Sequence, residues 1–235
     1  MKLEICANSV QSALNAQEAG AHRIEICSEL SLGGITPSYG VLKEISKQLQ
    51  IDAFVLIRPR AGNFVYSKIE FEVMKQNISL CKELGFKGIV SGVLNADHSI
   101  NLQRTKELLE LSKPLSFTFH RAFDEVPNAK EALKQLIHLG VNRLLTSGQK
   151  ENATQGITLL IALQQLAKNK LIIIPGSGIH SKNVLLFKEA GFQEIHTSAS
   201  RPLSKLNPNS YFDAPIQTAS YIPEIKEILK IIKHA

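Results

Sequence analysis

The 235-residue chain has few cysteines and no hydrophobic segment long enough to cross a membrane. Its three cysteines are an odd number, too few for a disulfide framework, so we expect free thiols and a reducing compartment. No apolar run approaches the roughly 18 to 20 residues that span a bilayer. The first residues lead directly into a strand-like segment, which does not resemble a signal peptide. We therefore expect a cytoplasmic protein with no membrane partner.

The chain also lacks a linker and a basic stripe. No Pro-, Gly- or Ser-rich segment interrupts it, and a hydrophobic content of 44% is typical of one globular domain, here residues 1–235. The net charge is +6, but the lysines are scattered over helical segments and are not interleaved with aromatic residues. We therefore expect a solvated basic surface and no nucleic-acid partner.

Strand-like and helical segments alternate along the whole sequence. The expected strands are residues 3–8, 23–27, 53–60, 88–94, 115–120, 143–147, 171–175 and 194–198. The expected helices are residues 9–19, 38–48, 68–84, 102–112, 128–139, 155–167, 183–190 and 223–233. About eight β/α units predict a (β/α)8 TIM barrel. The alternative is an open doubly wound sheet, whose central strands are usually fully apolar, as only residues 171–175 are here.

The expected strands alternate apolar and polar residues, so each has one polar face. In a barrel this pattern directs a set of polar side chains toward the axis or the upper rim: Glu4, Cys6, Asn8, Glu25, Cys27, Arg58, Arg60, Thr118, His120, His196 and Ser198. Buried charges need partners, because an unpaired one is strongly destabilising. Two interpretations remain: an ion-pair lattice joining Glu4, Glu25 and Arg58 low in the barrel, or a functional site at the carboxyl ends of the strands.

The densest group of reactive residues follows the expected fifth strand. His120 could transfer a proton there, Arg121 could bind an anion, and Asp124 could orient either of them. Alternatively, Asp124 merely pairs with Arg121. Together with Arg58 and Arg60, this segment predicts a cationic mouth for a carboxylate or a phosphate. Glu25, also inward-facing, is the second candidate catalytic carboxylate.

Glycine and serine residues occur where the last three strands are expected to end. Ser147 and Gly148 follow the sixth strand, Gly176 and Gly178 the seventh, and Ser198 lies at the end of the eighth. Barrels often bind phosphate on backbone N–H groups of the last loops. These five residues are therefore candidate ligand-binding positions. Tight turns without a ligand are the alternative for the glycines, and we favour a small anionic ligand.

Cys6 and Cys27 are inward-facing on neighbouring strands. Thiolates, with imidazole nearby, are ligands for Cu(I) and Zn. The alternative is that two small buried thiols pack as hydrophobic side chains. No C-x-x-C or H-x-H motif occurs, so spacing alone does not assign a metal site.

Six motifs together resemble the CutC family of copper homeostasis proteins. In this chain they are residues 4–9 (EICANS), 21–27 (AHRIEIC), 33–38 (GGITPS), 57–60 (IRPR), 118–124 (TFHRAFD) and 145–148 (LTSG). The resemblance implies a cytoplasmic single-domain TIM barrel that forms a homodimer or higher homo-oligomer and is associated with copper tolerance. It also implies Cu(I) binding by Cys6 and Cys27. The chain differs from the family at Asn63, where an aspartate is common, and after Ser200, where no family motif is recognisable.

Two functional hypotheses follow from these residues. The first is a copper homeostasis protein that binds Cu(I), with a copper ion as its partner. The second is a barrel enzyme for a small anionic ligand, with His120 as the acid/base group and Arg58, Arg60 and Arg121 as anion clamps. The fold alone does not choose between them.

Overall fold

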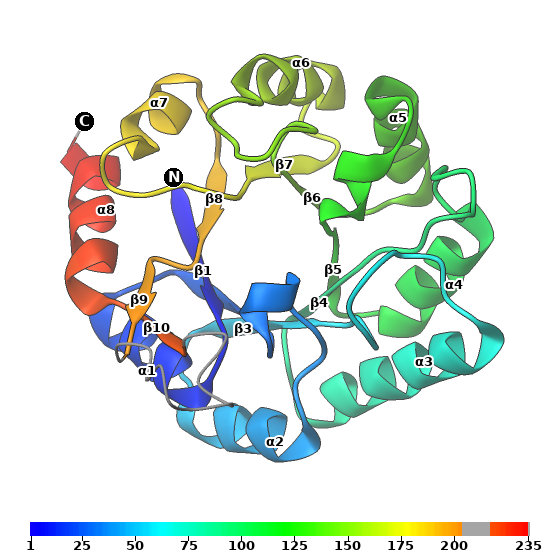
Figure 1. The fold of residues 1–235 in the computed structure, drawn as a ribbon, viewed down its shortest axis with the longest axis horizontal. Coiled ribbons are helices and arrows are strands. Elements are labelled where there is room, and N and C mark those ends of the chain that lie inside the picture. The colour runs from blue at the N-terminus through cyan, green and yellow to red at the C-terminus, as the bar shows by residue number, and fades with distance from the viewer. Residues whose placement is uncertain (204–216, 235) are drawn as a thin grey trace, which may run out of the picture.

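The computed structural model describes residues 1–203 and 217–234, and its centre is a ring of eight parallel strands (Figure 1). The strands are β1 (Lys2–Ala7), β2 (Arg23–Ile26), β3 (Asp52–Leu56), β4 (Gly88–Ser91), β5 (Ser116–Phe119), β6 (Arg143–Thr146), β7 (Ile172–Pro175) and β8 (Glu194–Thr197). Their hydrogen-bonded order is β7-β6-β5-β4-β3-β2-β1-β8, all parallel. β7 and β8 lie next to each other and complete the ring.

Eight helices surround the ring, one after each strand, so the prediction of a (β/α)8 TIM barrel is confirmed. They are α1 (Val10–Ala19), α2 (Tyr39–Gln48), α3 (Lys68–Glu83), α4 (Leu102–Ser112), α5 (Ala129–Leu139), α6 (Ile157–Ala167), α7 (Val184–Glu189) and α8 (Ile222–His234). Side-chain caps fix several helix starts, as where Ser67 and Glu70 form a capping box at α3. Among the helices in the described ranges, none is both long and apolar enough to span a membrane.

The period-two pattern separates two hydrophobic regions. The outward-facing residues of the strands, such as Leu3 and Ile5, are fully buried in the large core between the ring and the helices. A second, small cluster lies inside the barrel and contains Cys6, Cys27, Phe54, Leu56 and Val90. The polar residues predicted to face inward must therefore share the barrel interior with only a few apolar side chains.

An ion-pair network fills the amino-terminal half of the barrel interior. Arg23 Nε lies 2.5 Å from Glu4 Oε2, and Arg23 Nη2 lies 2.5 Å from Glu194 Oε2. Arg143 Nε adds a contact of 3.2 Å to the same Glu194 oxygen. Both guanidinium groups also lie against the ring of Phe54, at 4.6 and 5.2 Å from its centroid. The prediction that Arg58 would be the cation of this lattice was wrong, because Arg23 fills that role.

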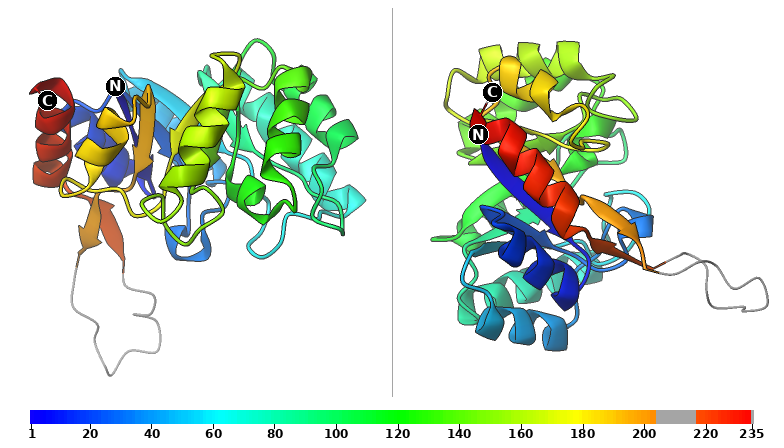
Figure 2. Two further views of the ribbon diagram at one scale, coloured as in Figure 1. Left: turned by 90° about the horizontal axis from the view of Figure 1, so that it is seen from above. Right: turned by 90° about the vertical axis from the view of Figure 1, so that its left-hand side faces the viewer.

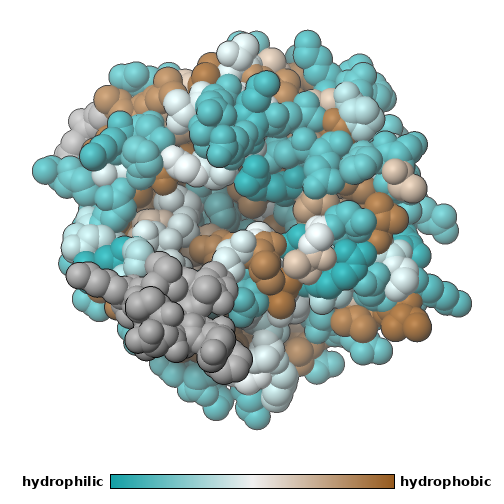
Figure 3. All heavy atoms as spheres, in the orientation of Figure 1, coloured by the Kyte–Doolittle hydropathy of each residue, from teal (hydrophilic) through white to brown (hydrophobic). Residues whose placement is uncertain are grey.

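The carboxyl-terminal end of the barrel carries additional short elements. These are two 3-10 helices, η1 (Leu30–Leu32) and η2 (Arg121–Glu125), and the hairpin of β9 (Ser200–Pro202) and β10 (Thr218–Ser220). Figure 2 shows the hairpin projecting beyond this end of the barrel. Residues 204–216, part of the segment after Ser200 in which no family motif is recognisable, lie outside the described residues. In Figure 3 the same end of the molecule is hollowed near its centre.

Candidate functional site

A cavity of about 540 Å³ opens at the carboxyl-terminal end of the barrel. Cys6, Glu25 and His196, which come from three strands, line it together with the apolar side chains of Leu56 and Phe64. The other lining residues are Arg58, Leu30, Gly33, His120, Arg121, Leu145, Ser177, Gly178, Ile179, His180, Thr197, Ser198, Ala199, Ser200, Tyr221 and Glu224. A volume of this size can enclose most of a small-molecule ligand.

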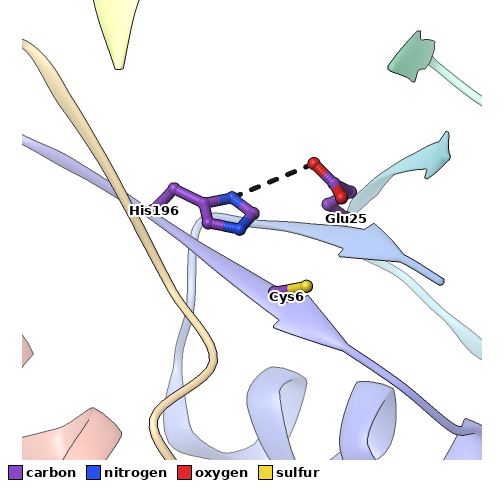
Figure 4. A group of neighbouring side chains, drawn as sticks. All are labelled: Cys6, Glu25 and His196. Atoms are coloured by element: carbon purple, nitrogen blue, oxygen red, sulfur yellow. Dashed lines mark ion pairs between the residues drawn. The ribbon is translucent and has the colours of Figure 1, made fainter. Parts of the chain in front are cut away.

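Glu25 lines this cavity and has one carboxylate oxygen that is buried without a hydrogen-bond partner among the described residues. Figure 4 shows Glu25, His196 and Cys6 pointing toward one another from β2, β8 and β1. His196 Nδ1 is 2.8 Å from Glu4 Oε1 but 4.0 Å from Glu25 Oε2, which has no hydrogen-bond partner among the described residues. Burial, reinforced by the negative charge of Glu4, raises the pKa of Glu25 to about 7. Glu25 can therefore exchange a proton near neutral pH.

Glu4 and His196 form the charged pair beneath Glu25. Burial opposes charge on both groups, but Arg23 and His196 lower the pKa of Glu4 to about 2. The hydrogen bond to Glu4 and the nearby Glu25 raise the pKa of His196 above its usual value. His196 is thus held by Glu4 on its Nδ1 side, and its ring lies between the ion-pair network and the cavity.

His120 is held as a neutral hydrogen-bond donor. It caps η2, where its Nδ1 accepts a hydrogen bond of 3.2 Å from the backbone N–H of Ala122. Burial, assisted by the positive charge of Arg58, lowers the pKa of His120 to about 3. A neutral ring whose Nδ1 accepts carries its hydrogen on Nε2. That Nε2 is buried without a partner among the described residues and belongs to a side chain that lines the cavity.

Arg58 joins three loop carbonyls at the wall of the cavity. Its Nη1 donates to Leu32 O at 2.9 Å and to Gly34 O at 2.7 Å, and its Nη2 donates to Gly62 O at 2.7 Å. The Nε has no partner among the described residues, and the side chain is 5% exposed. Arg58 therefore fixes the loops after β2 and β3.

Arg60 lies away from the cavity, which corrects the prediction of a second inward-facing arginine. Its Nε pairs with Glu70 Oε1 at 2.5 Å, and its Nη1 donates to Asn63 O at 3.0 Å. β3 ends at Leu56, so the strand alternation no longer governs where Arg60 points. Asn63, which replaces the common family aspartate, is part of this outer contact through its Oδ1, 3.2 Å from Arg60 Nη2.

Asp124 connects η2 to the end of β6 and does not line the cavity. It accepts hydrogen bonds from Arg121 Nε at 2.8 Å, from Ser147 N at 3.1 Å and from Gln149 N at 3.1 Å. The Arg121–Asp124 pairing weighed from the sequence is therefore present. Arg121 also donates to Ser147 Oγ at 2.9 Å, and of these residues only Arg121 lines the cavity. Asp124 and Ser147 act by positioning Arg121.

The candidate glycines divide into two groups. A side chain on Gly148 would meet the backbone of Gly156 at 2.4 Å, and one on Gly176 would meet Leu145 Cδ1 at 2.6 Å, so both permit close packing. Gly178 does line the cavity, as does Ser198, whose Oγ lies 3.0 Å from Ser200 Oγ. Of the predicted ligand-binding positions in these last loops, Gly178 and Ser198 lie where they could contact a ligand in the cavity.

Cys6 and Cys27 lie next to each other, with 3.7 Å between their sulfur atoms. Both are buried free thiols, and Cys6 lines the cavity. The hydrogen bond with Cys27, together with burial, raises the pKa of Cys6 well above its usual value. Metal bonds of about 2.3 Å in a tetrahedral site separate two thiolates by about 3.8 Å. The sulfur spacing therefore fits a soft metal ion, which would have to displace the thiol protons.

Two residues that shape the site, Phe64 and Arg23, were not predicted from the sequence. Phe64 packs its ring 4.9 Å from that of His120 and lies 5.1 Å from the guanidinium of Arg58. It follows the end of β3 in a loop, where no periodicity predicts orientation. Arg23, by contrast, has the same strand parity as Glu25, so the alternation already contained the signal for its inward position.

The family model of the CutC family matches residues 1–201 of this chain. The chain belongs to the CutC family. A CutC family protein of Photorhabdus laumondii is 48% identical over 200 residues, which cover 85% of this chain and 80% of that protein. A CutC family protein of Proteus mirabilis is 46% identical over the same shares of the two chains.

A solved CutC structure has the same architecture. The protein from Streptococcus agalactiae, described as a candidate copper homeostasis protein CutC, gives a TM-score of 0.80 at 33% identity, covering 84% of this chain and 98% of that one. A 3-hexulose-6-phosphate synthase from Salmonella typhimurium, at 14% identity and a TM-score of 0.64, shares the fold alone. The CutC resemblance of the motifs is thereby confirmed, and the family name connects the chain with copper homeostasis.

Proposed function

We propose that this CutC barrel is an enzyme that binds a small anionic molecule in its cavity. The observation that carries the proposal is a set of three buried polar atoms, Glu25 Oε2, Arg58 Nε and His120 Nε2, that have no partner among the described residues. They come from three different strand ends, and their side chains line one cavity. A buried unsatisfied polar group costs about 1–3 kcal/mol, so three in one place are typical of a site that a ligand completes.

The three groups have different chemical roles in this proposal. Glu25 exchanges a proton with the ligand, because its side chain lines the cavity beside His196 and its Oε2 has no hydrogen-bond partner among the described residues. His120, which the sequence suggested as the acid/base group, donates a hydrogen bond from Nε2 instead, since Nδ1 is occupied by Ala122. Arg58, with Arg121 at the rim, supplies the positive charge that attracts an anion.

Backbone strain beside the cavity supports ligand binding at the ends of β7 and β8. Ser177 and Ala199 both line the cavity and both have positive φ angles, 82° and 42°, which are unfavourable for residues with a side chain. Strain of about 1–3 kcal/mol per residue is often retained at ligand-binding sites. The loops after β7 and β8 are also where barrels commonly bind anionic groups on backbone N–H groups.

A thermal-shift screen with small carboxylates, inorganic phosphate and sugar phosphates tests binding. We expect at least one anion to raise the melting temperature of the wild type and of Arg60→Met, a control arginine outside the cavity, but to have a much smaller effect on His120→Gln. Anions that bind are then incubated with wild type and Glu25→Gln and analysed for conversion by NMR. Loss of a proton-transfer group should slow conversion by about 100-fold or more. No shift with any anion would contradict the proposal, whereas an equal shift in His120→Gln would show that His120 is not one of the groups that bind the ligand.

A second candidate function is Cu(I) binding by Cys6 and Cys27, and it is favoured by the 3.7 Å between their sulfur atoms. Glu25 and His196 place further donor atoms within 4.8 Å of Cys6. Titration with Cu(I) against a competing chelator should give one ion per chain in the wild type and in Cys81→Ala, a control thiol on α3. Binding that is unchanged in Cys6→Ser/Cys27→Ser would exclude the cysteine site.

Two further expectations belong to the same proposal. A cytoplasmic location is supported by the three free thiols, two of them close together, which suit a reducing compartment. The homodimer or higher homo-oligomer expected of the family stays a prediction, and analytical ultracentrifugation of the full chain tests it.

A further inference from the structure

Arg58 is a buried cation that forms no ion pair with an acidic residue among the described parts of the chain. The other two arginines of the barrel interior, Arg23 and Arg143, both pair with Glu194, and Arg23 also pairs with Glu4. In residues 1–203 and 217–234, no carboxylate forms an ion pair with Arg58, whose bonds go to neutral carbonyl groups. Isolating a buried charge in this way is strongly unfavourable, so the site is suited to an anion from outside.

The free donor of His120 belongs to the same part of the cavity wall. Phe64 contacts both side chains, and the charge of Arg58 acts on the imidazole of His120. Each donor group is fixed by other bonds: Arg58 by three carbonyls and His120 by the N–H of Ala122. Gly92 leaves room for the imidazole, since a Cβ there would lie 2.7 Å from Cε1 and Nδ1 of His120. The two free donors are therefore preorganised.

We propose that Arg58 Nε and His120 Nε2 form a subsite for a carboxylate group of the ligand, with one oxygen on each donor. This inference rests on the proposed function and narrows its ligand to a carboxylic acid. A carboxylate has two coplanar acceptor oxygens and a single negative charge, which matches one guanidinium beside a neutral imidazole. A phosphate monoester, with a charge of about −1.5 to −2 at pH 7, would leave excess negative charge in a buried place. A neutral carbonyl group would leave Arg58 uncompensated.

Pyruvate, its methyl ester and inorganic phosphate are suitable probes for the full-length protein with ¹⁵N-labelled histidine. The His120→Gln spectrum identifies the His120 signals. We expect pyruvate to shift the His120 Nε2–H signal in a saturable way, whereas methyl pyruvate, which lacks the charge, does not shift it. The His120→Gln substitution should weaken pyruvate binding at least tenfold, and Arg60→Met should leave it within twofold.

The possible outcomes separate this inference from the proposed function. If phosphate shifts the His120 signal and pyruvate does not, the carboxylate assignment is wrong. The proposed function, which requires only an anionic ligand, then still stands. An anion that binds without moving the His120 signal overturns the subsite and also leaves the proposed function in place. If no anion binds at all, both fail. The wild-type spectrum decides these cases even if Arg58→Met, which removes three loop contacts, does not fold.

Discussion

His120 shows how one backbone hydrogen bond determines what a side chain can do. The sequence placed a histidine at the end of the fifth strand, and its inward direction followed from alternation with Phe119. Its tautomer did not follow, because that depends on the N–H of Ala122, which reaches Nδ1 only when η2 forms. The sequence therefore predicted the position of His120, whereas its role as a donor required the structure.

The buried His120 should make the protein less stable in acid. In the folded state its pKa is about 3, below the pKa of 6.5 expected in the unfolded chain, so the unfolded state binds more protons as the pH falls below 7. This difference removes about 2 kcal/mol of stability between pH 7 and pH 5. Urea unfolding at pH 7 and pH 5 measures this loss of unfolding free energy. The loss should be smaller in His120→Gln than in the wild type by this amount. An equal loss in both proteins would mean that folded His120 protonates normally.

Arg23 should be essential to the stability of the barrel interior. Removing it leaves Glu4 and Glu194 buried without their main cation. We expect Arg23→Ala to reduce the free energy of unfolding by about 3–5 kcal/mol. Lys75→Ala, which removes a surface ion pair with Glu72 and Glu107, should cost less than about 1 kcal/mol. Denaturant unfolding measures both, and similar losses in the two variants would contradict the account.

At the scale of elements, the ends of the strands decide which predicted residues reach the site. Period-two alternation correctly placed Glu4, Cys6 and Glu25 inside the barrel, because β1 and β2 run through these positions. It failed at Arg60, since β3 stops at Leu56 and the loop then turns the chain outward. Strand length depends on pairing with neighbours, which a local pattern does not contain.

The close packing of β4 against the end of β5 makes Gly92 a positioning residue. A methyl group there would collide with the His120 ring at 2.7 Å, so Gly92→Ala should displace the imidazole. We expect at least a tenfold loss of anion affinity, measured by calorimetry. Gly40→Ala in α2, where the nearest atom is 4.0 Å away, should leave affinity unchanged and stabilise the helix by about 0.5–1 kcal/mol. Unchanged affinity in Gly92→Ala would show that the ring position is not critical.

At the scale of the whole molecule, closing the ring brings residues that are distant in sequence to one cavity. Glu25, Arg58 and His120 are separated by up to 95 positions, yet their side chains line the same space. The barrel fold and the CutC motifs made this gathering predictable. Which of the polar residues would be left unpaired was not predictable, because Asp124, Arg23 and Glu70 could each have found other partners in a different loop arrangement.

Native mass spectrometry of the gently purified full-length protein tests the central claim most directly. Because the cavity keeps three buried polar atoms unsatisfied, the wild type should carry the additional mass of a small organic anion. The same mass should be absent from His120→Gln and present in Cys6→Ser/Cys27→Ser. A wild-type spectrum that shows only the bare chain would contradict an anion-binding barrel. The same conclusion would follow if the only additional mass were copper, present in His120→Gln and absent from Cys6→Ser/Cys27→Ser.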